Sequence, residues 1–66
     1  MKKFRDEVNE VRAMLMGAEI DAEKFDNGNE SAGRRARVAL SKIAGRCVLL
    51  KREMMAATKG REDAKK

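Results

Sequence analysis

Hydrophobic residues near the start of the chain recur with alternating spacings of four and three. The series is Phe4, Val8, Val11, Leu15, Ala18, Ala22 and Phe25. Spacings of this kind place the side chains on one stripe of an α-helix, and the period-two alternation of a strand is absent. The pattern therefore predicts a helix over about residues 2–26, on the order of 38 Å long at about 1.5 Å per residue.

A second series with the same spacing follows in residues 29–57. Its members are Ala36, Leu40, Ile43, Cys47, Leu50, Met54 and Ala57. This series predicts a second helix over about residues 30–58. The remaining residues, 59–66, read KGREDAKK. Because charged residues dominate this segment, we expect it to form a flexible tail.

Two asparagines and a glycine separate the predicted helices. Gly28 can adopt the left-handed conformation that ends a helix, and Asn29 can cap the next helix. A link as short as residues 27–29 forces the two helices to lie antiparallel. The sequence thus predicts an all-α fold, an antiparallel two-helix hairpin that is coiled-coil-like and occupies residues 1–58.

Apolar side chains remain outside both predicted stripes. They are Ala13, Met16 and Ile20 in the first helix and Val38, Val48 and Leu49 in the second. A chain of 66 residues buries a small fraction of its surface, and Cys47, its only cysteine, has no partner for a disulfide. We expect Cys47 to lie in the core and the remaining apolar surface to be covered by self-association. A homodimer forming a helical bundle is the simplest closed arrangement, and higher oligomers stay open.

The composition argues against an enzyme. The chain has no His, Trp or Tyr, and it therefore lacks Ser-His and Cys-His pairs. One cysteine without histidine cannot supply the four ligands of a structural zinc site. The acidic residues are expected to form a solvated surface that pairs with Lys and Arg. We therefore predict no catalytic, cofactor-binding or metal-binding residues.

The sequence also bears on the compartment. The first residues, MKKFRDEVNEV, lack the apolar core of a signal peptide. No apolar run approaches the roughly 20 residues of a membrane span. A single cysteine suits a reducing compartment. We expect a cytoplasmic protein without a membrane partner.

Charge is distributed unequally between the two halves. Residues 1–28 carry five Lys and Arg against seven Asp and Glu, a net charge of −2, whereas residues 29–66 carry eleven against four, a net charge of +7. Basic charge gathered on one segment is typical of proteins that bind phosphates. The positive potential is therefore expected on the second helix.

Eight basic residues in the second predicted helix and directly after it are the candidate nucleic-acid contacts: Arg34, Arg35, Arg37, Lys42, Arg46, Lys51, Arg52 and Lys59. At about 100° per residue, Arg35, Lys42 and Arg46 align on one flank of the helix. Lys and Arg release condensed counterions when they contact a phosphate backbone. The alternative is a solvated surface that pairs with the acidic first helix. The absence of Trp and Tyr argues against recognition of single strands by base stacking.

The segment GNESAGRRARVAL resembles the small bacterial linker-histone-like DNA-binding proteins. The positions that carry the resemblance are Gly28, Asn29, Ala32, Gly33, Arg35, Ala36, Arg37 and Ala39, together with Ile43, Lys51 and Arg52. The resemblance covers roughly residues 20–58. It implies DNA binding with little sequence preference and chromosome compaction, and it supplies no active site. Some members add a long Lys-, Ala- and Pro-rich tail that this sequence does not reproduce.

Taken with the resemblance, the charge pattern favours a histone-like, nucleoid-associated protein. Such a protein would bind duplex DNA through backbone phosphates with little sequence specificity, as a homodimer or higher oligomer. Two alternatives remain open at this stage. One is an RNA-binding helical hairpin dimer, and the other is a structural coiled-coil adaptor that binds another protein.

Overall fold

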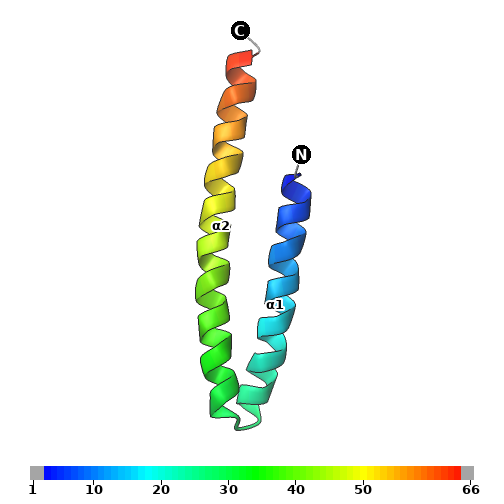
Figure 1. Ribbon diagram of the computed structural model, residues 1–66, viewed down its shortest axis with the longest axis vertical. Helices are drawn as coiled ribbons and strands as arrows, with labels where there is room; N and C mark the ends of the chain where they lie inside the picture. Colours follow the sequence, from blue (N-terminus) through cyan, green and yellow to red (C-terminus); the bar gives the residue numbers. More distant parts are fainter. Residues whose placement is uncertain (1–2, 65–66) are drawn as a thin grey trace.

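The computed structural model describes residues 3–64, with side chains described over residues 3–61. Two α-helices, α1 (Phe4–Asp26) and α2 (Glu30–Ala64), run antiparallel and are joined by residues 27–29 (Figure 1). The molecule measures 58 × 16 × 15 Å. The predicted all-α helical hairpin is confirmed, and no regular structure other than helix occurs within residues 3–64.

The turn is built from backbone hydrogen bonds that end α1 and a side chain that begins α2. The N–H of Asn29 donates to the carbonyl of Lys24 at 3.0 Å, and that of Gly28 donates to Phe25 at 2.9 Å. These two bonds form a Schellman motif, which requires a left-handed residue after the helix. Gly28 supplies it with a φ of +99°. The predicted role of this glycine is confirmed.

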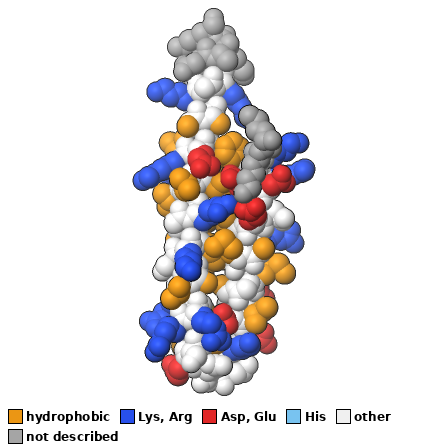
Figure 2. Space-filling model, in the orientation of Figure 1, with side chains coloured by type: hydrophobic (Ala, Val, Ile, Leu, Met, Phe, Trp, Pro, Cys, Tyr) orange, Lys and Arg blue, Asp and Glu red, His pale blue; other side chains and the backbone are white. Residues whose placement is uncertain are grey.

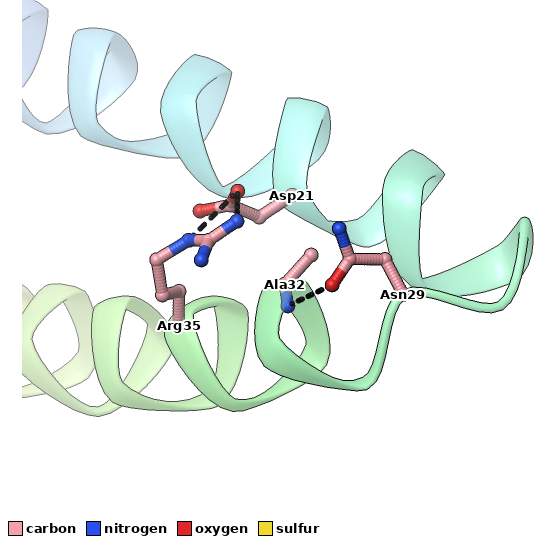
Figure 3. A network of polar contacts seen from close by, with 4 residues as sticks. All are labelled: Asp21, Asn29, Ala32 and Arg35. Carbon is pink, nitrogen blue, oxygen red and sulfur yellow. Dashed lines mark hydrogen bonds and ion pairs between the residues drawn. The ribbon is translucent and has the colours of Figure 1, made fainter.

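Asn29 serves both helices. Its backbone completes the end of α1, while its side-chain Oδ1 accepts a hydrogen bond from the N–H of Ala32 at 3.0 Å (Figure 3). That bond satisfies one of the four unpaired donors at the start of α2. Because one residue ends the first helix and caps the second, the link is short and the helices are held antiparallel.

The second helix is longer than predicted. It continues to Ala64, whereas we expected it to end near Thr58 and residues 59–66 to form a flexible tail. The prediction was wrong for residues 59–64, and residues 65–66 lie outside the described part. Charge alone does not stop a helix, because Lys, Arg, Glu and Ala are good helix formers and this segment contains no proline. Gly60, at about 1 kcal/mol relative to Ala, is not enough to end it.

The buried seam of the hairpin shares only half of each predicted stripe. Its buried apolar members are Val11, Ala18, Ala32, Ala36, Ile43 and Leu50. Its half-buried members are Phe4, Glu7, Met14, Asp21, Ala39, Arg46 and Ala57. In both helices these buried and half-buried residues also recur with spacings of four and three. We call each such set of positions a frame, and the observed frame is rotated about the helix axis toward one edge of the predicted stripe. The two frames share every seventh residue, so five of these six buried positions were predicted correctly, whereas Ala32, the most deeply buried, lies outside the predicted stripe.

The other half of each stripe is exposed. Leu15 and Leu40 keep 46% and 50% of their surface, and Cys47 is also exposed, so its predicted place in the core was wrong. The reason is geometric. A two-helix hairpin covers only one edge of a wide apolar stripe, and here the polar side chains of Glu7, Asp21 and Arg46 border the covered edge. The apolar residues expected outside the stripes, such as Val38, are confirmed as exposed.

The closest approach of the helices lies beside the turn. A Cβ atom placed on Gly33 would come within 2.9 Å of three carbons of the Phe25 ring. Gly33 is buried beneath that ring, and Ala32 next to it is 0% exposed. The absence of a side chain at Gly33 therefore lets an aromatic ring of α1 pack directly on the backbone of α2.

Candidate nucleic-acid interface

All eight predicted basic residues lie on α2, between Arg34 and Lys59. Seven of them are exposed, and Arg46 is half-buried. The 25 residue steps from Arg34 to Lys59 span about 38 Å along the helix. Figure 2 shows Lys and Arg side chains projecting along the edges of the molecule, with hydrophobic side chains reaching the surface between the helices. The structure therefore arranges the basic residues along a rod.

Two of the eight basic residues form ion pairs with α1. Nε and Nη2 of Arg35 each donate to Oδ1 of Asp21 at 3.3 Å (Figure 3). Farther from the turn, Nη2 of Arg46 donates to Oε2 of Glu10 at 2.8 Å. Each pair connects the helices at a level equidistant from Gly28, since the partners lie seven residues to either side in one and eighteen in the other. The acidic helix thus neutralises part of the predicted basic flank.

These ion pairs lower the positive potential expected along the predicted flank of Arg35, Lys42 and Arg46. Exposed ion pairs contribute about 0.2–1 kcal/mol each, so neither pair is a strong stabilising element. Their larger effect is on the surface potential, because an arginine beside a carboxylate attracts a phosphate less. Within residues 3–61, only Lys42 of this flank has no ion pair. Pairing of the basic residues with the acidic first helix was an expected alternative, but these partners were not identified, although their equal distance from Gly28 could have revealed them.

The other five candidate residues are exposed and have no ion pair among the described side chains: Arg34, Arg37, Lys51, Arg52 and Lys59. At about 100° per residue, Arg34, Arg52 and Lys59 lie on the side of α2 roughly opposite its buried seam. We call these three residues the outer row. No acidic residue of α1 reaches it, because α1 packs on the other side of the helix.

The open end of the molecule adds to this exposure. α2 has 35 residues and α1 has 23, so α2 extends about 18 Å beyond the start of α1 at about 1.5 Å per residue (Figure 1). Lys59 lies on this extension. The basic surface of α2 is therefore accessible from several directions near its end.

The comparison with protein families decides what kind of chain this is. The family described as histone H1-like protein Hc1 matches residues 2–60. The chain belongs to this family. No curated protein and no solved structure matches it significantly. The resemblance seen in the sequence is thereby confirmed.

The Hc1 match covers all of α1, the turn, α2 as far as Gly60 and all eight basic residues. A histone H1-like family is a family of DNA-binding proteins and is generally non-enzymatic, in line with the predicted class of function. Among residues 3–61 no group of three or more His, Cys, Asp and Glu could hold a metal ion. Neither described helix has the length and apolarity needed to cross a membrane.

Proposed function

We propose that this Hc1-family chain is a nucleoid-associated, histone-like protein that binds duplex DNA through backbone phosphates with little sequence specificity. One observation carries the proposal. Six of the eight candidate basic residues of α2 are exposed and have no ion pair within the described side chains, in a chain whose family is histone H1-like. The proposal places the protein in the cytoplasm, on the nucleoid.

The geometry of the outer row supports contact with a duplex. Arg34 and Lys59 are separated by about 38 Å, which is close to the roughly 34–36 Å of one turn of B-DNA. Lys and Arg on such a row neutralise phosphates and release counterions, and Arg can also bind a phosphate with two parallel hydrogen bonds. Contacts to phosphates position a protein without reading sequence. Random duplexes should therefore bind about as well as any chosen sequence.

Base stacking has little support in this molecule. The only aromatic residues are Phe4 and Phe25. Phe4 packs against the buried cluster, and the Phe25 ring lies over Gly33. Stacking platforms for single strands use several exposed aromatic side chains, whereas Phe25, at 47%, is the only exposed aromatic residue here and Phe4 is half-buried. Duplex binding through charge is thus favoured over single-strand binding.

The contributions of the eight candidate residues are expected to differ. The outer row should supply the main phosphate contacts, and Arg37 and Lys51, which line grooves between the helices, should contribute less. Lys42 should contribute as well. Arg35 and Arg46 should contribute less, because a carboxylate of α1 already occupies each guanidinium.

We further propose that the protein acts as a homodimer or a higher oligomer. The support is the exposed apolar surface, which includes Val8, Leu15, Leu40 and Met54 on a chain of only 66 residues. Self-association would also double the number of basic helices in one particle. Binding to DNA would then draw on both copies.

A gel-shift titration with random duplex DNA over a salt series tests the proposal. If three outer-row contacts per protomer act in a dimer, about six phosphates are neutralised and the slope of log K against log salt should be about −5. Replacing Arg34, Arg52 and Lys59 together by Glu should weaken binding by at least about 100-fold and flatten the slope.

The matched control replaces three exposed basic residues of α1, Arg5, Arg12 and Lys24, by Glu. It makes the same change in net charge but leaves the outer row intact, so its affinity should stay closer to that of the unmodified protein. Equal losses in the two variants, with folding intact, would contradict a DNA surface on α2. Equal competition by structured RNA would remove the preference for DNA.

A further inference from the structure

Six residues form an exposed apolar face along one side of the hairpin. They are Val8, Leu15 and Ala22 of α1 and Leu40, Cys47 and Met54 of α2, and we call them the second apolar face. Their large members keep between 46% and 52% of their surface, as half-covered side chains at the edge of a seam do. In each helix they recur every seven residues.

These residues lie on one continuous side of the molecule. Val8, Cys47 and Met54 line a groove between the helices near the open end. Leu15, Ala22 and Leu40 line the groove that follows it toward the turn. Ala22 and Leu40 also line a third groove, which ends at Phe25 beside the turn. The apolar side chains therefore run along most of the hairpin.

We propose that a second copy of this chain covers the second apolar face and completes a four-helix bundle. The first argument is continuity with the intramolecular seam. In both helices the exposed positions alternate with the buried ones in a single 4-3 series, for example Leu40 between Ala36 and Ile43. A helix whose wide apolar stripe is only half covered by one neighbour has the pattern of a bundle helix with two neighbours.

The second argument is that the face is self-complementary. Leu15 and Leu40 lie at one level, thirteen residues before and twelve after Gly28. Val8 and Cys47 lie at a second level, twenty before and nineteen after. Each layer of the face therefore holds one side chain from each helix. A copy related by a two-fold axis along the hairpin meets every layer with the same layer, as a closed dimer requires.

Charge selects how the two copies are oriented. With the two-fold axis along the hairpin, α1 of the partner copy lies antiparallel over α2, and both turns lie at the same end. Glu19 and Arg37, each nine residues from Gly28, border the face and lie at one level. In this arrangement each Glu19 faces an Arg37 of the other copy. Stacking α2 on α2 would instead place Arg37 and Lys51 of the two copies along one edge, where like charges repel.

The arrangement leaves Arg52 and Lys59 of the outer row uncovered, because they lie opposite the buried seam of α2, whereas Arg34 also lines the groove beside the turn. The inference rests on the self-association proposed above and deepens it by assigning the face and the orientation. It does not depend on DNA binding. A dimer that fails to shift DNA would contradict the proposed DNA binding and leave this inference intact.

Sedimentation of the full chain tests which face is used. The unmodified protein should sediment as a dimer at micromolar concentration. Leu40→Glu places a charge in the face and should raise the dissociation constant at least about tenfold. Val38→Glu is the matched control, since Val38 and Leu40 are 51% and 50% exposed on the same helix. The control should change the constant by no more than about twofold.

Circular dichroism should be used to check that both variants remain helical. Leu40→Ala provides a second test of the face that adds no charge. A monomeric unmodified protein would overturn the inference. So would a control that dissociates as readily as Leu40→Glu, because the contact would then lie on another face.

Cross-linking tests the orientation. Cys47→Ser removes the native thiol, and Glu19→Cys and Arg37→Cys are then introduced in separate chains that are mixed and oxidised. A disulfide-linked dimer that contains one chain of each kind is expected, with little product from either chain alone. A product formed mainly by Arg37→Cys alone or Glu19→Cys alone would overturn the pairing of α1 with α2, as would the absence of any product from a mixture that sediments as a dimer.

Discussion

The two ends of the hairpin are held together by different means. At the turn, backbone bonds to Lys24 and Phe25, the left-handed Gly28 and the side chain of Asn29 fix the path of the chain. At the open end, α1 begins after Lys3 without a side-chain cap, and α2 extends beyond it. The turn end is thus specified by local backbone chemistry, whereas the open end depends on helix propensity and apolar burial.

The same comparison applies to the charges. Near the turn, Arg35 is paired with Asp21, so charge contributes to the contact between the helices. Toward the open end, Lys51, Arg52 and Lys59 have no ion pair among the described side chains. Arg46, farther from the turn, is also paired, with Glu10, whereas Arg34 and Arg37 near the turn have no ion pair among the described side chains. Each end therefore has one paired arginine, and basic residues without an ion pair occur at both ends of α2.

The largest expected effect comes from removing the apolar contact that holds the open half. Leu50 is 6% exposed and belongs to the buried cluster. Leu50→Ala should lower the free energy of unfolding by about 2–5 kcal/mol, measured by urea denaturation at fixed protein concentration. Leu49→Ala is the matched control, because Leu49 is 52% exposed. A loss below about 0.5 kcal/mol for Leu50→Ala would show that burial does not hold this half.

Alanine substitutions at two glycines should have smaller effects on stability, and these effects should be opposite in sign. They test whether the helices pack tightly beside the turn. Gly33→Ala adds a methyl group against the Phe25 ring and should destabilise the protein by about 1–3 kcal/mol. Gly45→Ala has open space around the new Cβ and should stabilise α2 by up to about 1 kcal/mol. Thermal unfolding at fixed concentration measures both. If both variants were stabilised, the ring would be able to move and the contact at the turn would not be tight.

The cap at Asn29 should contribute less than the glycine contact. Asn29→Ala removes the acceptor for the N–H of Ala32, which is 0% exposed and has little access to water. The expected loss is about 1 kcal/mol, within the usual 0.5–2 kcal/mol for such caps. Hydrogen exchange of the first turn of α2 should accelerate in parallel. Asn29→Asp, which keeps an acceptor, should restore both readouts, and failure of that rescue would contradict a capping role.

Much of the fold could be predicted because its determinants are local. Gly28 and Asn29 indicate the turn by their backbone preferences, and the 4-3 series predicts two helices. The seam was predicted only in part, because two helical frames share every seventh residue. Val11 and Ile43 belong to both frames, whereas Leu15 and Leu40 belong to the frame that the hairpin leaves open. Which frame closes depends on tertiary packing.

Composition could not predict where α2 ends or which of its basic residues form ion pairs with α1. A charged segment such as residues 59–64 continues as a helix when its residues are good helix formers and no stop signal is present. Whether an arginine of α2 forms an ion pair depends on its neighbour on α1, as Arg46 and Glu10 show. Pairing of this kind follows from the antiparallel register, which becomes usable once Gly28 is placed as its centre.

The substitution with the smallest expected effect on stability also tests whether Asp21 neutralises Arg35. Asp21→Asn removes the partner of Arg35, and an exposed pair of this kind should contribute only about 0.2–1 kcal/mol. The same change frees one guanidinium, so affinity for duplex DNA should rise and the salt slope should steepen by up to about 1 for each newly contacted phosphate. Glu23→Gln is the matched control, because it makes the same change in charge on α1 at a residue with no ion pair among the described side chains. An equal gain in both variants would mean that net charge alone governs binding and that the pairing of Arg35 has no separate effect.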